Sequence, residues 1–308
     1  MSNVEANRSK RAVWKKLATE SANPKSARLD RLGIARVVAL MQAEDRQVLA
    51  ALRGARREIV RAAEVFAATF RAGDRCFLFG AGTSGRLAVI EAAELPPTFG
   101  TDPTRVQAII AGGRGAVFRA REGAEDDYED GIRRAGRVRR GDLVLGVSAS
   151  SVTRFVRGAL DRARERGART VLVTASLSPG IEEVAEIVVR LDTGPEVVAG
   201  STRLKAGTAT KLALNQITTA AFASSGKVFG PWMVDLRAGS AKLKDRALRI
   251  IAAATSGTPR KARALLARAN GEVKTAIVMG RAGLSPAVAR RRLEKAQGDL
   301  RTALGMSS

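Results

Sequence analysis

The sequence has 308 residues, a formal net charge of +23, no histidine and a single cysteine, Cys76. This composition excludes Ser-His-Asp and Cys-His nucleophile systems and metal sites built on histidine or several thiolates. Cys76 lies in an apolar run, where a cysteine is usually inert packing. One cysteine fits a reducing compartment, and the sequence shows no apolar leader or membrane-spanning stretch, so we expect a cytoplasmic protein.

The positive charge raises the possibility of nucleic-acid binding. However, the arginines are spread over helical patterns, and aromatic residues make up only 4% of the chain, which leaves few platforms for base stacking. We therefore expect a solvated basic surface that attracts a small anionic substrate, and no nucleic-acid site.

The predicted elements alternate along the chain. Residues 1–16 are polar and should be frayed, and helical spacing runs from about Leu29 to Phe70. Strand-like runs follow at 75–80, 106–111, 142–147, 169–174 and 186–191, with helical patterns at 85–95, 115–137, 152–166 and 180–185 between them. Strands that alternate with helices predict an α/β fold with a parallel sheet covered by helices.

The strand patterns end near residue 230. Helical patterns then cover 241–255, 258–269, 271–280 and 285–304, and Thr258 before Pro259 predicts a capped helix start. We expect an N-terminal helical arm over 1–57, an α/β domain over 58–230 and a helical C-terminal subdomain over 231–308.

Three glycines, Gly80, Gly82 and Gly85, mark the turn between the first predicted strand and the next helix. Backbone amides and the positive end of the helix converge at such a turn and bind anions. The spacing also matches the dinucleotide fingerprint, but that fingerprint needs an acidic residue after the second strand, where this chain has Gly112 and Gly113. Because Thr83 and Ser84 add hydroxyls, we favour a phosphate group over NAD.

A second hydroxyl-rich segment, residues 148–153, ends the strand at 142–147 and begins the next helix. Taken alone it could be a simple helix cap. Parallel strands end at one edge of a sheet, so the two segments should lie together. The arrangement is similar to sugar isomerase (SIS) domains, which hold a sugar phosphate without a metal. The candidate phosphate-binding residues are Thr83, Ser84, Gly85, Ser148, Ser150, Ser151 and Thr153.

Two pairs of glutamates lie one helical turn apart. Glu91 and Glu94 precede Pro96 and Pro97, where we expect the helix to stop, and Glu122 and Glu125 should lie on the following helix. Acids on helix surfaces are commonly just solvated. Without histidine, however, proton transfer must use carboxylates, lysine, the single tyrosine or water.

Several segments together resemble the N-acetylmuramic acid 6-phosphate etherase family. They are 80–87, 94–100, 110–113, 122–127, 194–208, 226–230, 233–235 and 273–279. The resemblance covers about residues 17–305. One segment differs: the family usually has Ala-Ser-Gly-Arg-Thr-Pro where this chain has Ala-Ser-Ser-Val-Thr-Arg at 149–154. We expect this loop still to bind phosphate, but more weakly.

The resemblance implies a three-layer SIS fold and a homodimeric lyase of cell-wall sugar recycling that needs no cofactor or metal. It would convert N-acetylmuramic acid 6-phosphate into N-acetylglucosamine 6-phosphate and D-lactate by elimination and hydration. Glu94 matches the family acid that protonates the departing lactate, and Glu125 matches the second essential carboxylate. We add Glu122 as a substrate-binding residue.

Two other functions stay open. A non-catalytic SIS protein could bind a sugar phosphate and regulate a partner protein, as glucokinase regulatory protein does. Retention of Glu94 and Glu125 favours the enzyme, whereas the altered 149–154 segment favours the sensor. An aldose-ketose isomerase would share the phosphate site, but the segment at 94–97 does not favour it.

Overall fold

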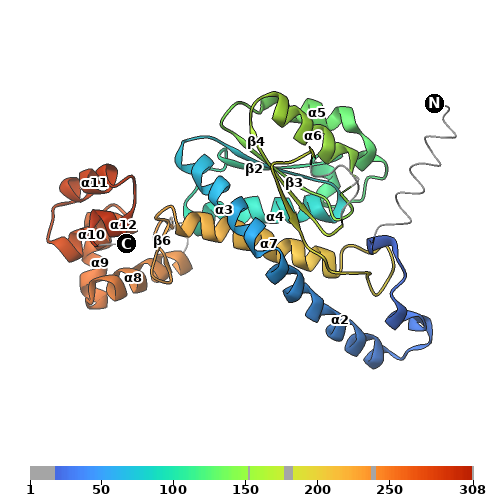
Figure 1. Cartoon of the computed structure of the whole chain (residues 1–308). Helices are drawn as coiled ribbons and strands as arrows, with labels where there is room; N and C mark the ends of the chain where they lie inside the picture. Colours follow the sequence, from blue (N-terminus) through green and yellow to red (C-terminus); the bar gives the residue numbers. More distant parts are fainter. Residues whose placement is uncertain (1–17, 152, 177–182, 237–240, 307–308) are drawn as a thin grey trace. The chain divides into compact units, whose positions relative to one another are not determined.

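The computed structural model describes residues 18–151, 153–176, 183–236 and 241–306 (Figure 1). The chain divides into two compact units. Unit 1 comprises Met1–Ala92 and Thr104–Thr218, and unit 2 comprises Ala93–Pro103 and Thr219–Ser308. The segment 1–16, expected to be frayed, lies outside the described residues. None of the described helices is both long enough and apolar enough to cross a membrane.

Unit 1 is built on a sheet of five parallel strands. They are β1 (Cys76–Gly80), β2 (Val106–Ile110), β3 (Leu143–Val147), β4 (Arg169–Thr174) and β5 (Ile187–Arg190). Their order is β2-β1-β3-β4-β5, so β1 lies between β2 and β3. β1 and β3 are buried along their whole length, as expected where helices cover both faces. The predicted parallel α/β fold is confirmed.

Helices cover both faces of this sheet (Figure 1). On one face lie α5 (Tyr128–Arg134) and α6 (Arg154–Glu165), where Phe79 of β1 packs against Phe155 with ring centroids 6.0 Å apart. On the other face, α3 (Arg56–Arg71) contacts β1, β3 and β5. With α2 (Ile34–Gly54), α3 confirms the helices predicted between Leu29 and Phe70.

Cys76 lies in β1 between Val106 of β2 and Leu143 of β3. Its side chain is fully buried, and burial raises the pKa of the thiol. The thiol is therefore a packing group of the central sheet, as interpreted from the sequence.

The helix predicted over 115–137 is wrong for most of its length. The stretch contains α5 and short 3₁₀ turns at Arg114–Val117, Ala124–Asp126 and Ala135–Arg137. Gly123 interrupts the helical pattern because its φ of 76° lies in the left-handed region. Consequently Glu122 lies in a turn and Glu125 in a 3₁₀ turn, not together on one helix.

The sequence suggested that the helix after β1 stops at the two prolines, but α4 (Gly82–Phe99) continues past them. Pro96 and Pro97 lie in its last turn, where they have no N–H to donate to the carbonyls of Ala92 and Ala93. The carbonyl of Pro96 still accepts a hydrogen bond, from the Gly100 N–H at 3.0 Å. The prolines therefore weaken the end of this helix without ending it.

One helix of the structure was not predicted, and one predicted helix cannot be compared over its whole length. The sequence patterns did not predict α7 (Lys205–Ala223), whose small alanines and threonines are buried on several sides and give no clear amphipathic period. The helix predicted at 180–185 begins outside the described residues.

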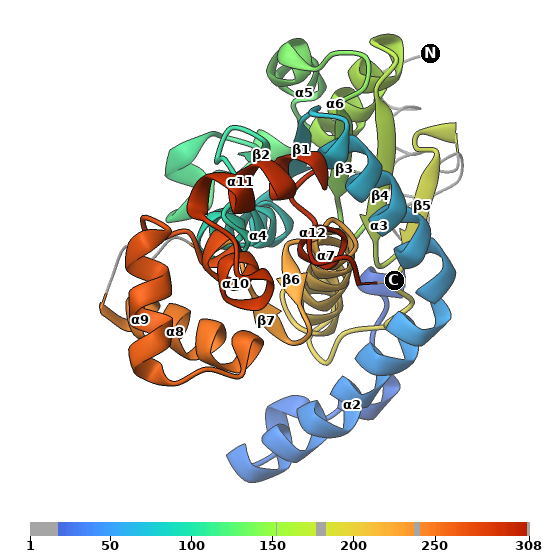
Figure 2. The ribbon, with the colours of Figure 1, turned by 90° about the vertical axis from the view of Figure 1, so that its left-hand side faces the viewer.

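Unit 2 contains a small antiparallel pair, β6 (Val228–Phe229) and β7 (Trp232–Met233), and short helices (Figure 2). The helices are α8 (Ala241–Thr255), α9 (Pro259–Arg268), α10 (Val273–Ala282), α11 (Pro286–Lys295) and α12 (Leu300–Ala303). Their core includes Ile250, Ile277 and Leu300. Thr258 accepts a hydrogen bond from the Lys261 N–H at 3.3 Å, so the predicted capped start is confirmed.

The helix predicted at 285–304 is divided into α11 and α12. Gln297 and Gly298 separate them, with φ angles of 52° and 80°. Both angles lie in the left-handed region, which no α-helix can continue through.

Candidate functional site

The turn between β1 and α4 is closed by two glycines whose backbones touch. A Cβ atom at Gly80 would lie 2.7 Å from the amide nitrogen of Gly85, and one at Gly85 would lie 2.5 Å from Cγ1 of Ile110. Neither position tolerates a side chain, so the strand turns directly into the helix. The Gly85 N–H donates to the carbonyl of Ala81 at 3.0 Å. The amides of residues 82–84 precede the helical ladder and can receive an anion.

Thr83 and Ser84 lie in this first turn of α4, and both are half-buried. Neither hydroxyl has a hydrogen-bond partner among the residues that the structure describes. Hydroxyls and amides that the described residues leave unpaired, at the positive end of a long helix, are the donors that a phosphate group requires.

The segment after β3 reaches the same edge of the sheet, because Gly80 of β1 pairs in register with Val147 of β3. Ser148 is buried, and its hydroxyl oxygen lies 2.8 Å from that of Thr153. Thr153 is the N-cap residue of α6 but makes no side-chain cap. Thr153 therefore contacts Ser148 and does not cap the first amides of α6.

Ser151 stands where the resemblance places a family glycine, and its φ of 60° is left-handed. Glycine adopts this conformation freely, whereas serine does so at a cost of about 1 kcal/mol. The Ser151 hydroxyl donates to the carbonyl of Ser150 at 2.6 Å. The backbone here thus keeps a conformation that suits glycine although the residue has changed. Val152 lies outside the described residues.

A cavity of about 200 Å³ opens beside this turn, on the side of β2; we call it the site cavity. It is lined by Ala81, Gly82, Arg86, Ala111, Ala116, Ala120, Arg121, Glu122, Gly123, Ala124 and Glu125. The Arg86 Nε donates to the carbonyl of Val117 at 2.8 Å. Within the described part of the chain, the charged groups of Arg121, Glu122 and Glu125 have no hydrogen-bond or ion-pair partner.

Glu125 is an exposed residue, but partial desolvation of its carboxyl raises the pKa, and the neighbouring charge of Asp126 raises it further. A carboxyl with a raised pKa holds a proton closer to neutral pH, which suits a general acid or base. The predicted site residues Thr83, Ser84 and Gly85 thus lie at the same sheet edge as this carboxyl.

The two glutamates of α4 differ in their surroundings. Glu94 is exposed and lies in the part of α4 that groups with unit 2, so it does not line the site cavity. Glu91 is buried and accepts hydrogen bonds from Asn215, at 2.7 Å, and from Thr218, both on α7. Glu91 is therefore an internal link between two helices, not a solvated surface acid.

The sequence reasoning missed a buried polar cluster formed by Asn23, Glu44, Gln47 and Lys205, which the exposed Lys25 joins from the surface. Glu44 accepts hydrogen bonds from Asn23 at 2.7 Å, Lys25 at 2.8 Å and Lys205 at 2.7 Å. The side chains of Lys205 and Glu44 are only 1% and 2% exposed. Burial by itself raises the pKa of Glu44, but these three hydrogen bonds outweigh it and lower the pKa to about 2.

This cluster lies at the first turn of α7, which has its own carboxylate cap. Buried Glu196 accepts hydrogen bonds from the amides of Lys205 at 3.1 Å and Ala206 at 2.9 Å. Burial raises the pKa of Glu196, and these amide hydrogen bonds oppose the rise. A Cβ atom at Gly207 would lie 3.6 Å from the methyl group of Thr83. The start of α7 is thus blocked to anions while it packs beside the open start of α4.

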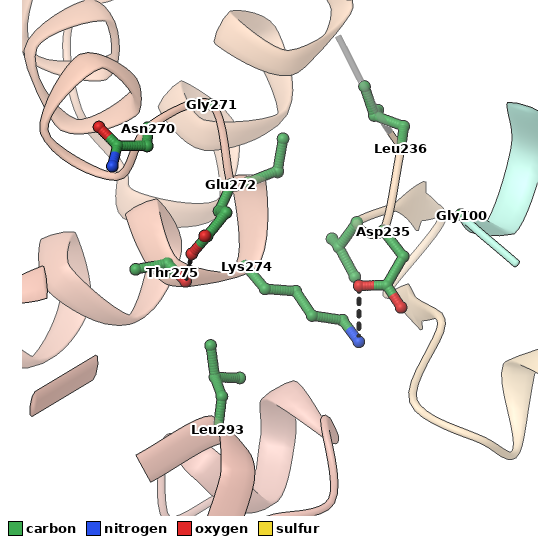
Figure 3. A pocket seen from close by; sticks show the side chains of 11 residues that line it. Gly100, Asp235, Leu236, Asn270, Gly271, Glu272, Lys274, Thr275 and Leu293 are labelled. Carbon is green, nitrogen blue, oxygen red and sulfur yellow. Dashed lines mark hydrogen bonds and ion pairs between the residues drawn. The ribbon is translucent and has the colours of Figure 1, made fainter. Parts of the chain in front are cut away.

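Unit 2 has a cavity of its own, of about 580 Å³ (Figure 3). The Lys274 ammonium donates to Oδ1 of Asp235 at 2.8 Å and to the carbonyl of Gly298 at 2.6 Å, and Asp235 also pairs with Lys227. Burial lowers the pKa of Lys274, and the Asp235 charge opposes this. Because these charges satisfy one another, we assign this cavity no ligand.

Comparison with known proteins identifies the chain. The profile of the glucokinase regulatory protein N-terminal SIS domain matches residues 58–164, which agrees with the parallel sheet described above. The N-acetylmuramic acid 6-phosphate etherase of Gloeobacter violaceus is 48% identical over 273 residues, which cover 88% of this chain and 89% of that protein.

Two more relatives carry the same name. The protein of Crocosphaera subtropica is 46% identical over 274 residues, covering 88% of this chain and 90% of its own. The protein of Geobacillus thermodenitrificans is 46% identical over 265 residues, covering 85% of this chain and 90% of its own. The chain therefore belongs to the N-acetylmuramic acid 6-phosphate etherase family.

Proposed function

We propose that this enzyme cleaves the D-lactyl ether of N-acetylmuramic acid 6-phosphate, releasing N-acetylglucosamine 6-phosphate and D-lactate. The observation that carries the proposal is the sheet edge at which the hydroxyls of Thr83 and Ser84 adjoin a cavity with two carboxylates, all four groups being without a partner among the described residues. The names of the relatives supply the substrate.

The reaction runs through the ring-opened sugar, whose aldehyde acidifies the proton on C2. A base removes that proton, the electron pair forms a C2–C3 double bond, and the C3–O bond breaks. An acid protonates the departing lactate oxygen. Water then adds across the double bond, with its oxygen on C3 and a proton on C2. Two carboxyl groups and a bound phosphate can perform these steps.

We assign the role of Glu94 by resemblance alone, because it does not line the site cavity, and the other roles by resemblance and by position. Glu94 protonates the leaving lactate oxygen, and Glu125, whose pKa is raised by partial desolvation, is the second essential carboxyl group, with Glu122 beside the substrate. The phosphate is held by the hydroxyls of Thr83, Ser84, Ser148, Ser150, Ser151 and Thr153. Gly85 permits the close turn between β1 and α4 that presents Thr83 and Ser84.

The direct test is to incubate the purified protein with N-acetylmuramic acid 6-phosphate and to assay D-lactate. Glu94→Gln should fold normally and release lactate about a hundredfold more slowly, or worse, as expected for loss of a general acid. The matched control is Glu64→Gln, since Glu64 is an exposed glutamate of α3. Near-normal turnover of Glu94→Gln would remove Glu94 from the mechanism.

Isotopes test the elimination itself. Product formed in D₂O should carry deuterium at C2, and oxygen-18 from water should appear in the amino sugar. Oxygen-18 in the lactate instead would indicate substitution at the lactyl carbon and would overturn this mechanism.

If the protein releases no lactate but a sugar phosphate raises its melting temperature, it is a sensor.

We further propose that the enzyme is a cytoplasmic homodimer. The helix α2 carries exposed Ile34, Val38 and Leu49, at 85%, 47% and 57% exposure. At about 100° per residue they lie within roughly 60° of one another around the helix axis. Such an apolar face suits an interface between copies. Light scattering should give a mass twice that of the monomer, and Ile34→Lys should lower the measured mass towards that of the monomer.

A further inference from the structure

The position of Arg121 in the site cavity is set by two glycines. A Cβ atom at Gly112 would lie 3.0 Å from Cδ of Arg121, and one at Gly115 would lie 3.0 Å from a terminal nitrogen of the same side chain. The arginine therefore lies across a glycine turn that leaves room for it. Its guanidinium has no hydrogen-bond or ion-pair partner among the residues of the described ranges.

The order of the strands separates this guanidinium from the hydroxyl-rich segment. β1 lies between β2 and β3. The segment 148–153 follows β3, whereas Arg121 and Glu125 follow β2. Anion-binding groups thus stand on both sides of the β1–α4 turn. A ligand with two separate anionic groups could use both sides at once.

We propose that Arg121 binds the carboxylate of the D-lactyl group and so selects the acid form of the substrate; this rests on the proposed function. The planar guanidinium fork matches a carboxylate with two parallel hydrogen bonds. The cavity, of about 200 Å³, is smaller than pockets that enclose a whole drug-sized ligand, which are about 300–1,000 Å³. It suits one arm of the substrate.

Arg86 has a supporting role in this subsite. Its Nε is already committed to the carbonyl of Val117 at 2.8 Å, which fixes the plane of its guanidinium at the cavity wall. Arg121 has no such commitment to any of the described residues, so its whole fork can bind a ligand without losing a bond to them. The raised pKa of Glu125 also reduces the repulsion that a second carboxylate would meet there.

The test compares Arg121→Gln with Arg119→Gln, an exposed arginine that does not line the site cavity. Each is assayed with N-acetylmuramic acid 6-phosphate and with its lactamide analogue, in which a neutral amide replaces the carboxylate. Arg121→Gln should lower kcat/KM for the acid by about tenfold to a hundredfold, and for the amide by only a few-fold. Arg119→Gln should match wild type on both substrates.

Two competing anions distinguish the lactyl carboxylate from the phosphate. Arg121→Gln should weaken inhibition by D-lactate about tenfold or more and leave inhibition by inorganic phosphate unchanged. Weakened inhibition by phosphate alone would overturn the assignment and place the sugar phosphate at Arg121. Equal losses on acid and amide would likewise overturn it. If wild type releases no lactate from either substrate, the proposed function fails, whatever the variants do.

Discussion

Unit 1 contains two groups of charged side chains that the fold treats in opposite ways. In the buried polar cluster, Glu44 and Lys205 are almost completely enclosed and hydrogen-bonded. In the site cavity, Glu125 and Arg121 are open to solvent and have no partner within the described structure. The same chemical groups thus stabilise the fold in one place and remain unused in the other.

The difference indicates where a ligand belongs. Enclosed charges must be paired, since an unpaired one is costly to bury. Charges that a protein leaves unpaired in a concave surface can exchange water for a ligand at little cost to the fold. Substitutions in the cluster should therefore act on stability, and substitutions in the cavity on activity.

The largest effect should come from Lys205→Met, which leaves Glu44 buried with only Asn23 and the exposed Lys25 as donors. Removing one partner of a buried pair costs about 3–5 kcal/mol of the free energy of unfolding. Urea denaturation of wild type and Lys205→Met measures this loss of unfolding free energy.

Arg203→Met is the matched control for that substitution, because Arg203 is exposed and its loss should change stability by less than about 0.5 kcal/mol. Equal effects of the two variants would show that the buried pair contributes nothing. Adding Glu44→Leu to Lys205→Met should recover part of the loss.

The next effect is the pH dependence that Glu44 contributes. Its pKa in the folded protein is about 2, below the ordinary 4.5, so its stabilisation is complete above pH 4.5 and is lost as pH falls towards 2. The shift corresponds to roughly 3 kcal/mol. The free energy of unfolding should fall more steeply between pH 4.5 and pH 2 in wild type than in Glu44→Gln. Parallel curves would contradict this role.

In the cavity, Glu125→Gln should slow lactate release by about a hundredfold, as for loss of an acid–base group. Because this carboxyl has no partner in the described structure, stability should stay within about 0.5 kcal/mol of wild type. Glu129→Gln, on an exposed position of α5, is the control for activity. Turnover equal to that control, or a large loss of stability, would break the distinction between the two regions.

The smallest effect should come from Ser84→Ala. Its hydroxyl has no partner in the described structure, so removing it leaves no buried group unsatisfied and should not change the unfolding midpoint. One hydrogen bond to the phosphate is lost, which should raise KM by about tenfold with little change in kcat. An unchanged KM would place the phosphate away from α4.

The sheet could be predicted from the sequence because its signal is local. The runs that became β1 and β3 are continuously apolar, as strands covered on both faces must be. The errors also have local causes. Gly123 takes a left-handed conformation inside a helical pattern, and α4 continues through Pro96, whose carbonyl still has a donor.

The candidate site was predictable only in part. Gly80, Thr83 and Ser84 form a local motif whose anion-binding chemistry follows from their spacing. Lys205 and Glu44 are 161 residues apart, and no spacing rule connects them. Arg121 is one arginine among many in a basic chain, and only the glycine turn beneath it distinguishes it.

The enclosed Cys76 provides a built-in probe of conformational opening. It is the only thiol in the chain and lies fully buried in the strand between β2 and β3. An alkylating reagent can reach it only when that strand separates from its neighbours, so the labelling rate reports the opening free energy of the sheet. Substitutions around the cavity can thus be ranked for hidden structural damage by mass spectrometry, without an introduced label.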